Sequence, residues 1–306
     1  MDYELYHDES QAGGFWHGML LVPVPFRSLL IADLERARAN TRYRYALSFK
    51  NVRGKGRKYD CAAAWVQLGV AAMRSRTKER AYHVFLGRRR GQRQAEYVPI
   101  SYRVGAKFIL FCERDRLAEM SGHPNHASKI ETTFRMGFKG GLHFLGTEDD
   151  PIRIERLHFD GHEHLQRRVD RNRAVDRITG LRGYCEISER HDLIDDRSSD
   201  HRKTDSQSYD DCQLLQLTDL LVGCFRTAIQ GEGRALRRSL ARPVRELLLR
   251  YQQGYARMQN SRWFRSFCMS QCYLEHGTWK FDTLECRTMQ SHVQLALPLG
   301  EQTALP

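Results

Sequence analysis

Several kinds of sequence feature are missing from this chain of 306 residues, and each absence removes a class of protein. No run of about 18 apolar residues exists, so no segment is expected to span a membrane. No basic-then-apolar leader precedes the first strand-like pattern, and no internal repeat is evident. We therefore expect a protein without repeats that works in the cytoplasm and has no membrane partner.

The eight cysteines lack the tightly paired spacing of zinc fingers and zinc ribbons. Several fall inside apolar patterns, where a reduced thiol serves as a small core residue, and no disulfide framework is expected. Cys268, Cys272 and His276 recur every four residues, which would place them on one face of a helix, with Cys286 further on. A structural zinc ion at these residues is the alternative interpretation.

Positive charge dominates the chain, with a formal net charge of +12 and a pI near 9.5. Such a balance favours a polyanionic partner, nucleic acid before membrane. Two basic segments are the candidate contacts: Arg53, Lys55, Arg57 and Lys58 in a glycine-containing loop, and Arg88, Arg89 and Arg90 further on. The loop lacks the Walker spacing of a nucleotide-binding loop. A solvated charged surface is the alternative explanation for both segments.

The first stretch, residues 3–10, alternates large and polar side chains as a strand with two different faces does. Gly13 and Gly14 then turn the chain into a second, more apolar strand over 15–22, which predicts an N-terminal β-hairpin. Asp8 and Glu9 end the first strand, where charge costs free energy unless a cation or donor meets it. Alternatively, these residues only open the turn.

A second unusual acid, Asp219, lies in the middle of a leucine-rich helix predicted over 213–226. A buried carboxylate without a partner costs several kcal/mol. Gly223, one turn further on, leaves room for something to approach. A carboxylate that binds a cation is the favoured interpretation, and a structural hydrogen bond or a salt bridge to an arginine is the alternative.

A third acid, Asp160, follows an alternating strand predicted over 152–159, where catalytic acids of open α/β sheets often lie. His158, His162 and His164 surround it and offer a zinc-hydrolase alternative. Glu131 is a further possible ligand, although its spacing from Ser128 is that of a helix capping box.

The remaining pattern predicts a domain over 1–230, a helical and mixed extension over 231–290 that packs on the core, and a tail over 291–306. Strands are predicted at 42–49, 81–86 and 183–187, a polar loop at 192–211, and helices at 26–37, 59–74, 103–121, 126–146, 163–178 and 242–259. The helices over 103–146 are interpreted as an insertion in the first domain.

Clustered carboxylates repel one another unless divalent cations neutralise them, and hard oxygen ligands select Mg²⁺ or Mn²⁺. Two such ions can activate a water and stabilise the leaving oxygen in phosphodiester cleavage. Combined with the basic surface, Asp8, Asp160 and Asp219 predict a metal-dependent nuclease. The competing hypotheses are a non-catalytic nucleic-acid-binding subunit and the zinc-dependent hydrolase.

Four ordered motifs resemble those of DUF family 3800: Tyr6 to Ser10, Lys50, Asp205-Ser206 and the stretch from Leu215 to Leu221. Thr218 stands where the family more often has Ala, and Gln11 where it more often has Gly. The resemblance implies an RNase H-like α/β fold: a mixed sheet with an N-terminal hairpin, flanked by helices, here with a helical C-terminal extension. It also implies a metal site of three acids, with Glu9 and Lys50 as further catalytic candidates, and a nuclease role in bacterial defence or mobile elements with a possible protein partner.

Overall fold

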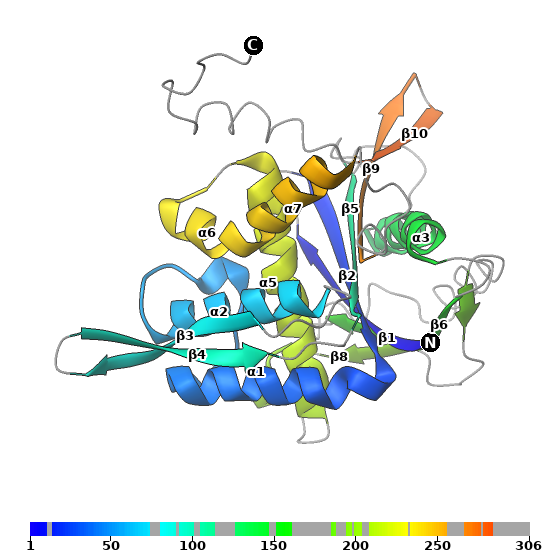
Figure 1. Cartoon of the computed structure of the whole chain (residues 1–306). Helices are drawn as coiled ribbons and strands as arrows, with labels where there is room; N and C mark the ends of the chain where they lie inside the picture. Colours follow the sequence, from blue (N-terminus) through cyan, green and yellow to red (C-terminus); the bar gives the residue numbers. More distant parts are fainter. Residues whose placement is uncertain are drawn as a thin grey trace, which may run out of the picture.

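The protein is a mixed α/β structure, seen here in a computed structural model (Figure 1). The structure describes residues 1–10, 14–73, 80–89, 92–100, 105–113, 126–146, 151–160, 185–187, 194–197, 199–203, 208–231, 233–255, 266–276 and 278–283. None of the helices in these ranges combines the length and apolar character that a membrane crossing requires.

One sheet of eight strands forms the centre of the described part, in the order β10-β9-β5-β2-β1-β6-β7, with β8 also paired to β6. The strands are β1 (Asp2–Ser10), β2 (Phe15–Pro23), β5 (Lys107–Glu113), β6 (Ile152–Asp160), β7 (Cys185–Ile187), β8 (Ile194–Arg197), β9 (Phe267–Glu275) and β10 (Thr278–Thr283). β1 pairs antiparallel with β2 and parallel with β6, so the sheet is mixed. The predicted N-terminal hairpin is confirmed.

Helices cover both faces of this sheet (Figure 1). On one face, α3 (His126–Leu145) packs on β5, β9 and β2. On the other face, α5 (Tyr209–Gln230) crosses β1 and β2 and contacts β6. The helices that pack beside α5 or on each other around it are α1 (Arg27–Thr41), α2 (Arg57–Ala72), α6 (Ala235–Leu240) and α7 (Arg242–Tyr255).

Strand β1 distributes its side chains between two hydrophobic cores, as its alternating sequence predicts. Tyr3 and Leu5 enter the core beneath α3, whereas Tyr6 enters the larger core beneath α5. His7 points to the α3 side, where its Nε2 lies 2.8 Å from His17 Nδ1. Asp8 consequently faces α5.

A β-bulge in β6 decides which face Asp160 occupies. Tyr3 pairs with Ile154 but Glu4 pairs with Arg156, so β6 carries one extra residue at this point. Ile152 and Ile154 enter the α3 core before the bulge, and Leu157 and Phe159 enter it afterwards. Strict alternation from Ile152 would place Asp160 on the α3 side, and the extra residue moves it to the α5 side.

Several sequence predictions differ from the structure. Residues 42–49 form an extended loop and the start of a 3₁₀ turn, η2 (Phe49–Asn51), because backbone groups of this segment bond to side chains rather than to a neighbouring strand. The predicted helix over 103–121 is wrong, since Lys107–Glu113 is the buried strand β5 at the centre of the sheet. Its apolar run fits a strand that helices cover on both faces.

The chain after residue 183 also departs from the prediction in part. The polar loop over 192–211 contains β8, the 3₁₀ turn η4 (His201–Lys203) and the first residues of α5. The Cys268 region is a strand, β9, rather than a helical face, and it joins the main sheet beside β5. The predicted helix over 163–178 and the tail over 291–306 lie outside the described residues.

Strand β3 (Arg80–Arg89) confirms the strand predicted over 81–86, but its partner β4 (Gln92–Ile100) was not predicted. The two form a separate antiparallel sheet that contacts α1 and α2 (Figure 1). The helices predicted over 26–37, 59–74, 126–146, 213–226 and 242–259 are confirmed with shifted ends.

Adjacent glycines in α3 test how closely this helix packs on the sheet. A Cβ atom added at Gly141 would lie 2.3 Å from Ile109 Cδ1, whereas one added at Gly140 would meet no atom within 4 Å. We expect Gly141→Ala to lower the free energy of unfolding by about 1–3 kcal/mol, and Gly140→Ala to raise it by about 0.5–1 kcal/mol. Urea denaturation checks both values, and a shift of the same sign for both variants would contradict the packing.

His7 makes stability depend on pH. Burial lowers the pKa of His7 to about 3, from 6.5 in the unfolded chain, so the folded state binds fewer protons. The resulting stabilisation is present above pH 6.5 and is lost as pH falls toward 3. Between pH 7 and pH 5 the loss amounts to about 2 kcal/mol. We expect the wild-type difference in unfolding free energy between these pH values to shrink by about this amount in His7→Gln. An unchanged difference would contradict a neutral buried His7.

Candidate metal centre

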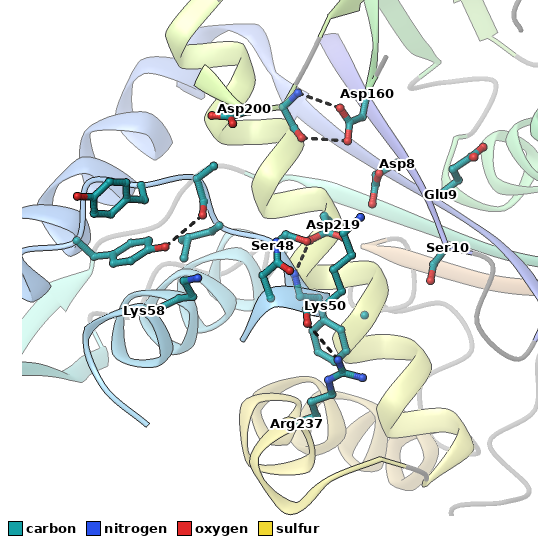
Figure 2. A pocket seen from close by; sticks show the side chains of 18 of the residues that line it. Asp8, Glu9, Ser10, Ser48, Lys50, Lys58, Asp160, Asp200, Asp219 and Arg237 are labelled. Carbon is teal, nitrogen blue, oxygen red and sulfur yellow. Dashed lines mark hydrogen bonds between the residues drawn. The ribbon is translucent and has the colours of Figure 1, made fainter. Parts of the chain in front are cut away.

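The three acids singled out in the sequence line one cavity of about 910 Å³ on the α5 side of the sheet. Asp8 comes from the end of β1, Asp160 from the end of β6 and Asp219 from the middle of α5 (Figure 2). Tyr6 pairs with His158 and His7 with Phe159, so the same register continued by one residue sets Asp8 beside Asp160. Glu9 and Lys50 line the same cavity.

Asp8 is the most constrained of the three acids. It is only 7% exposed, and its Oδ2 atom has no hydrogen-bond partner among the described residues. Burial raises the pKa of Asp8 well above its usual range, and the charges of Asp219, Asp160 and Glu9 raise it further. A buried carboxylate oxygen that points at other carboxylates is costly unless a cation lies between them.

Asp219 is held by the loop that precedes α2. Its Oδ2 accepts a hydrogen bond from the backbone N–H of Phe49 at 2.5 Å, and Ser48 also donates to this carboxylate. Burial raises the pKa of Asp219, while these hydrogen bonds and the charge of Lys50 oppose the rise. Gly223 allows this loop to approach α5 closely, because a Cβ atom at Gly223 would lie 2.1 Å from Phe49 Cγ. The glycine therefore makes room for the Phe49 ring, not for a ligand.

Asp160 is oriented by Ser199, a residue that sequence reasoning missed. The backbone N–H of Ser199 donates to Asp160 Oδ1 at 2.9 Å, and its hydroxyl donates to Oδ2 at 3.0 Å. Gln216, also missed, connects this arrangement to Asp219: its Nε2 donates to the Ser199 carbonyl, and its Oε1 accepts from the Leu47 N–H. Its position three residues before Asp219, within the motif from Leu215 to Leu221, was the available signal.

Cations line the same cavity as the acids. Among the described residues, five acids and five cations line it: Asp8, Glu9, Asp160, Asp200 and Asp219, with Lys50, Lys58, Arg202, Arg226 and Arg237. Figure 2 shows Lys58 at the opposite end of the pocket from Asp8 and Glu9, with Asp219 and Lys50 between them. The formal charges cancel when every acid is ionised, so divalent cations would make the cavity attractive to phosphate.

Only some of the basic residues predicted to contact nucleic acid line this cavity. Lys58 lines it, whereas Arg53, Lys55 and Arg57 are exposed and do not line it. Arg88 and Arg89 lie in β3, and Arg90 lies outside the described residues. Arg226 and Arg237 were not predicted as site residues. Arg226 donates to Ser10 Oγ at 2.6 Å, which ties α5 to the end of β1.

Glu131 lies on α3, the helix that covers the other face of the sheet. Of the predicted family motifs, Asp205-Ser206 lies outside the described residues.

A second cluster of acids joins β1 to the start of α5, and Arg27 forms ion pairs with it. Ligand atoms of Glu4, His158 and Asp211 lie within 4.8 Å of one another, a grouping that can hold a metal. Arg27 already pairs with Glu4 at 3.0 Å and with Asp211 at 2.5 Å, and Tyr6 also donates to both acids. Burial acts to raise the pKa of Glu4, but hydrogen bonds from His158 and Tyr6 and the nearby positive charges lower it to about 2. This cluster is a structural network.

The structure bears differently on the two zinc alternatives. His158 is 1% exposed and stacks on Tyr6 with ring centroids 4.4 Å apart, and the zinc-hydrolase alternative at this strand stays a prediction. His162 and His164 lie outside the described residues. Cys268 and Cys272 are four residues apart on a strand, which separates them by roughly 13 Å and prevents them from sharing one ion.

The donor type at the cavity suits Mg²⁺ or Mn²⁺. Carboxylate oxygens of Asp8, Asp160 and Asp219 line it, with Glu9 beside them, and hard divalent cations prefer such ligands. These three acids do not bring their ligand atoms within 4.8 Å of one another, as Glu4, His158 and Asp211 do among the described residues. Asp8 Oδ2 has no hydrogen-bond partner among the described residues, which a bound cation would explain.

Comparison with known proteins does not add to this picture: the chain matches no protein-family model, no curated protein and no solved structure.

Replacing Asp8 is expected to raise the stability of the metal-free protein and to weaken its stabilisation by manganese. In EDTA, Asp8→Asn should melt at a higher temperature than the wild type, because it removes a buried charge beside two other acids. Manganese at a hundred times its dissociation constant should stabilise the wild type by about 2–3 kcal/mol and the variant much less. Thermal melts with and without MnCl₂ measure both effects, with Asp282→Asn, on exposed β10, as the control. A lower melting temperature for Asp8→Asn in EDTA, with an undiminished manganese response, would contradict the metal centre.

Proposed function

We propose that the protein is a metal-dependent nuclease that hydrolyses phosphodiester bonds of nucleic acid. One observation carries the proposal: carboxylates from three separate elements line one cavity where Asp8 Oδ2 has no hydrogen-bond partner among the described residues, and cations line the same cavity. Neither a purely structural salt bridge nor a simple basic binding surface requires this arrangement. The net charge of +12 supports a polyanionic substrate.

The chain's own groups divide the work in this proposal. Asp8, Asp160 and Asp219 are the metal ligands, and Glu9 lies beside them as a further carboxylate. The N–H of Phe49 and the N–H and hydroxyl of Ser199 hold two of the acids in place. Lys50, Arg226 and Arg237 line the cavity where they meet phosphate oxygens. Two bound divalent ions would supply an activated water and stabilise the leaving oxygen.

As part of the same proposal, we assign the fold to the RNase H-like class. It is supported by the resemblance to DUF family 3800 and by the sheet, in which an antiparallel hairpin continues through β1 into parallel β6 and β8. The motif residues of that resemblance, Asp8, Glu9, Lys50 and Asp219, all line one cavity although they are up to 211 residues apart in sequence.

A non-catalytic nucleic-acid-binding subunit is the second candidate. The observation that favours it is the charge balance of the cavity, in which five cations offset five acids among the described residues that line it. In that case nucleic acid would bind equally well with Mg²⁺ and with EDTA, and no cleavage would occur.

Cleavage assays separate the two candidates. Labelled single- and double-stranded DNA and RNA are incubated with the purified protein in Mn²⁺, Mg²⁺ or EDTA. We expect cutting only with a divalent ion, and a loss of at least about a hundredfold in rate in Asp8→Asn and in Asp219→Asn, with binding retained. Asp282→Asn, on exposed β10, should cut like the wild type. Full activity of Asp8→Asn would exclude the proposed site, and binding without cutting in any metal would favour the second candidate.

A further inference from the structure

Two tyrosines line the pocket near Lys58. The rings of Tyr43 and Tyr45 meet edge to face, with centroids 5.8 Å apart and planes inclined by 63°. Tyr43 is buried, and the Lys58 ammonium lies 5.9 Å from the centre of its ring. Tyr45 is 62% exposed, although it belongs to the lining of the same cavity as the acids. The proposed nuclease site does not use either ring.

The backbone that carries Tyr45 is fixed. The Tyr45 carbonyl accepts a hydrogen bond from Arg38 at 2.8 Å, the Leu47 N–H donates to Gln216 and the Phe49 N–H donates to Asp219. Arg38 itself is only 3% exposed and lies 4.4 Å from the Trp65 ring. Every second residue of the segment is therefore anchored to α1 or α5, while the Tyr45 ring stays open. A scattered exposed aromatic residue is common on protein surfaces, but one presented by an anchored loop inside a cavity is preorganised for binding.

A guanidinium group completes this part of the pocket. The Cζ atom of Arg202 lies 6.0 Å from the centre of the Tyr45 ring, and Asp200 orients Arg202 by accepting hydrogen bonds from its Nε and Nη2. Tyr45 and Arg202 thus form a cation–aromatic pair, and Tyr43 and Lys58 form a second pair beside it. Aromatic rings interleaved with cations are typical of surfaces that bind single-stranded nucleic acid, since each base has a face that stacks.

The ring lies close to the acids along the chain. Phe49, whose N–H holds Asp219, lies only four positions after Tyr45, so their Cα atoms are at most about 14 Å apart. A base stacked on Tyr45 therefore belongs to a nucleotide near the phosphate that the activated water would attack. Bases inside a duplex expose only their edges, so stacking on Tyr45 requires an unpaired base.

We propose that Tyr45, with Arg202 beside it, is a stacking platform for an unpaired base, and that the protein takes single-stranded nucleic acid as its substrate. This inference rests on the proposed nuclease site for its catalytic meaning, but the platform is testable by binding alone.

Fluorescence anisotropy with EDTA present measures binding without cleavage. The probes are fluorescein-labelled 12-mers of DNA and RNA, each as a single strand and as a blunt duplex, added to the full chain. We expect tighter binding of the single strands, and a loss of about tenfold or more in Tyr45→Ala that spares the duplexes. Tyr45→Phe should bind like the wild type because it keeps the ring.

Salt dependence and a matched variant sharpen the test. Tyr45→Ala should keep the wild-type slope of affinity against salt, because Tyr45 stacks on a base and contacts no phosphate. Phe281→Ala removes another exposed aromatic side chain (54% exposed), on β10, and should change nothing. Equal losses for single strands and duplexes, or wild-type binding by Tyr45→Ala, would overturn the platform. If single-strand binding depends on Tyr45 but no metal supports cutting, the stacking platform is supported and the nuclease proposal is excluded. If the protein cuts nucleic acid equally well with and without the Tyr45 ring, the nuclease proposal is supported and the platform is excluded.

Discussion

The mutual repulsion of carboxylates buried in one cavity is the constraint on which the functional architecture depends. Asp8, Asp160 and Asp219 come from two strands and a helix, and burial together with neighbouring acids makes the ionised forms of Asp8 and Asp219 less stable than they would be in water. The fold holds them together regardless, through the Phe49 N–H on Asp219 and the Ser199 groups on Asp160. Asp8 Oδ2 has no such donor among the described residues.

The polar groups around the acids form a continuous support. Gln216 is 1% exposed and joins the Ser199 segment to the loop before α2, while Arg38 holds that loop from α1. Buried polar networks of this kind are stabilising only when their members are satisfied, and they then keep the attached groups in one geometry. The same loop presents Tyr45 to the cavity, so the acids and the aromatic ring share one rigid framework.

Much of the candidate site was predictable because its acids stand out against the sequence pattern around them. An acid at the end of an alternating strand, as with Asp8, and an acid inside a leucine-rich helix, as with Asp219, contradict their local pattern. Ser199 and Gln216 do not stand out in this way, because a serine in a polar segment and a glutamine in a helix are both ordinary. The strand β5 was predicted as a helix since a short, fully apolar run carries no periodicity that separates the two.

By itself, the sequence determined the N-terminal hairpin, the buried helix α5 and the identity of the unusual acids, because periodicity and burial are local properties. Only the tertiary structure decided that these acids meet. The bulge in β6 turns Asp160 to the α5 side, the opposite of what strict alternation from Ile152 predicts. The position of Arg226 and Arg237 beside the acids, and of Arg27 among Glu4 and Asp211, likewise follows from packing between distant segments. Such contacts depend on the path of the whole chain, which no local pattern contains.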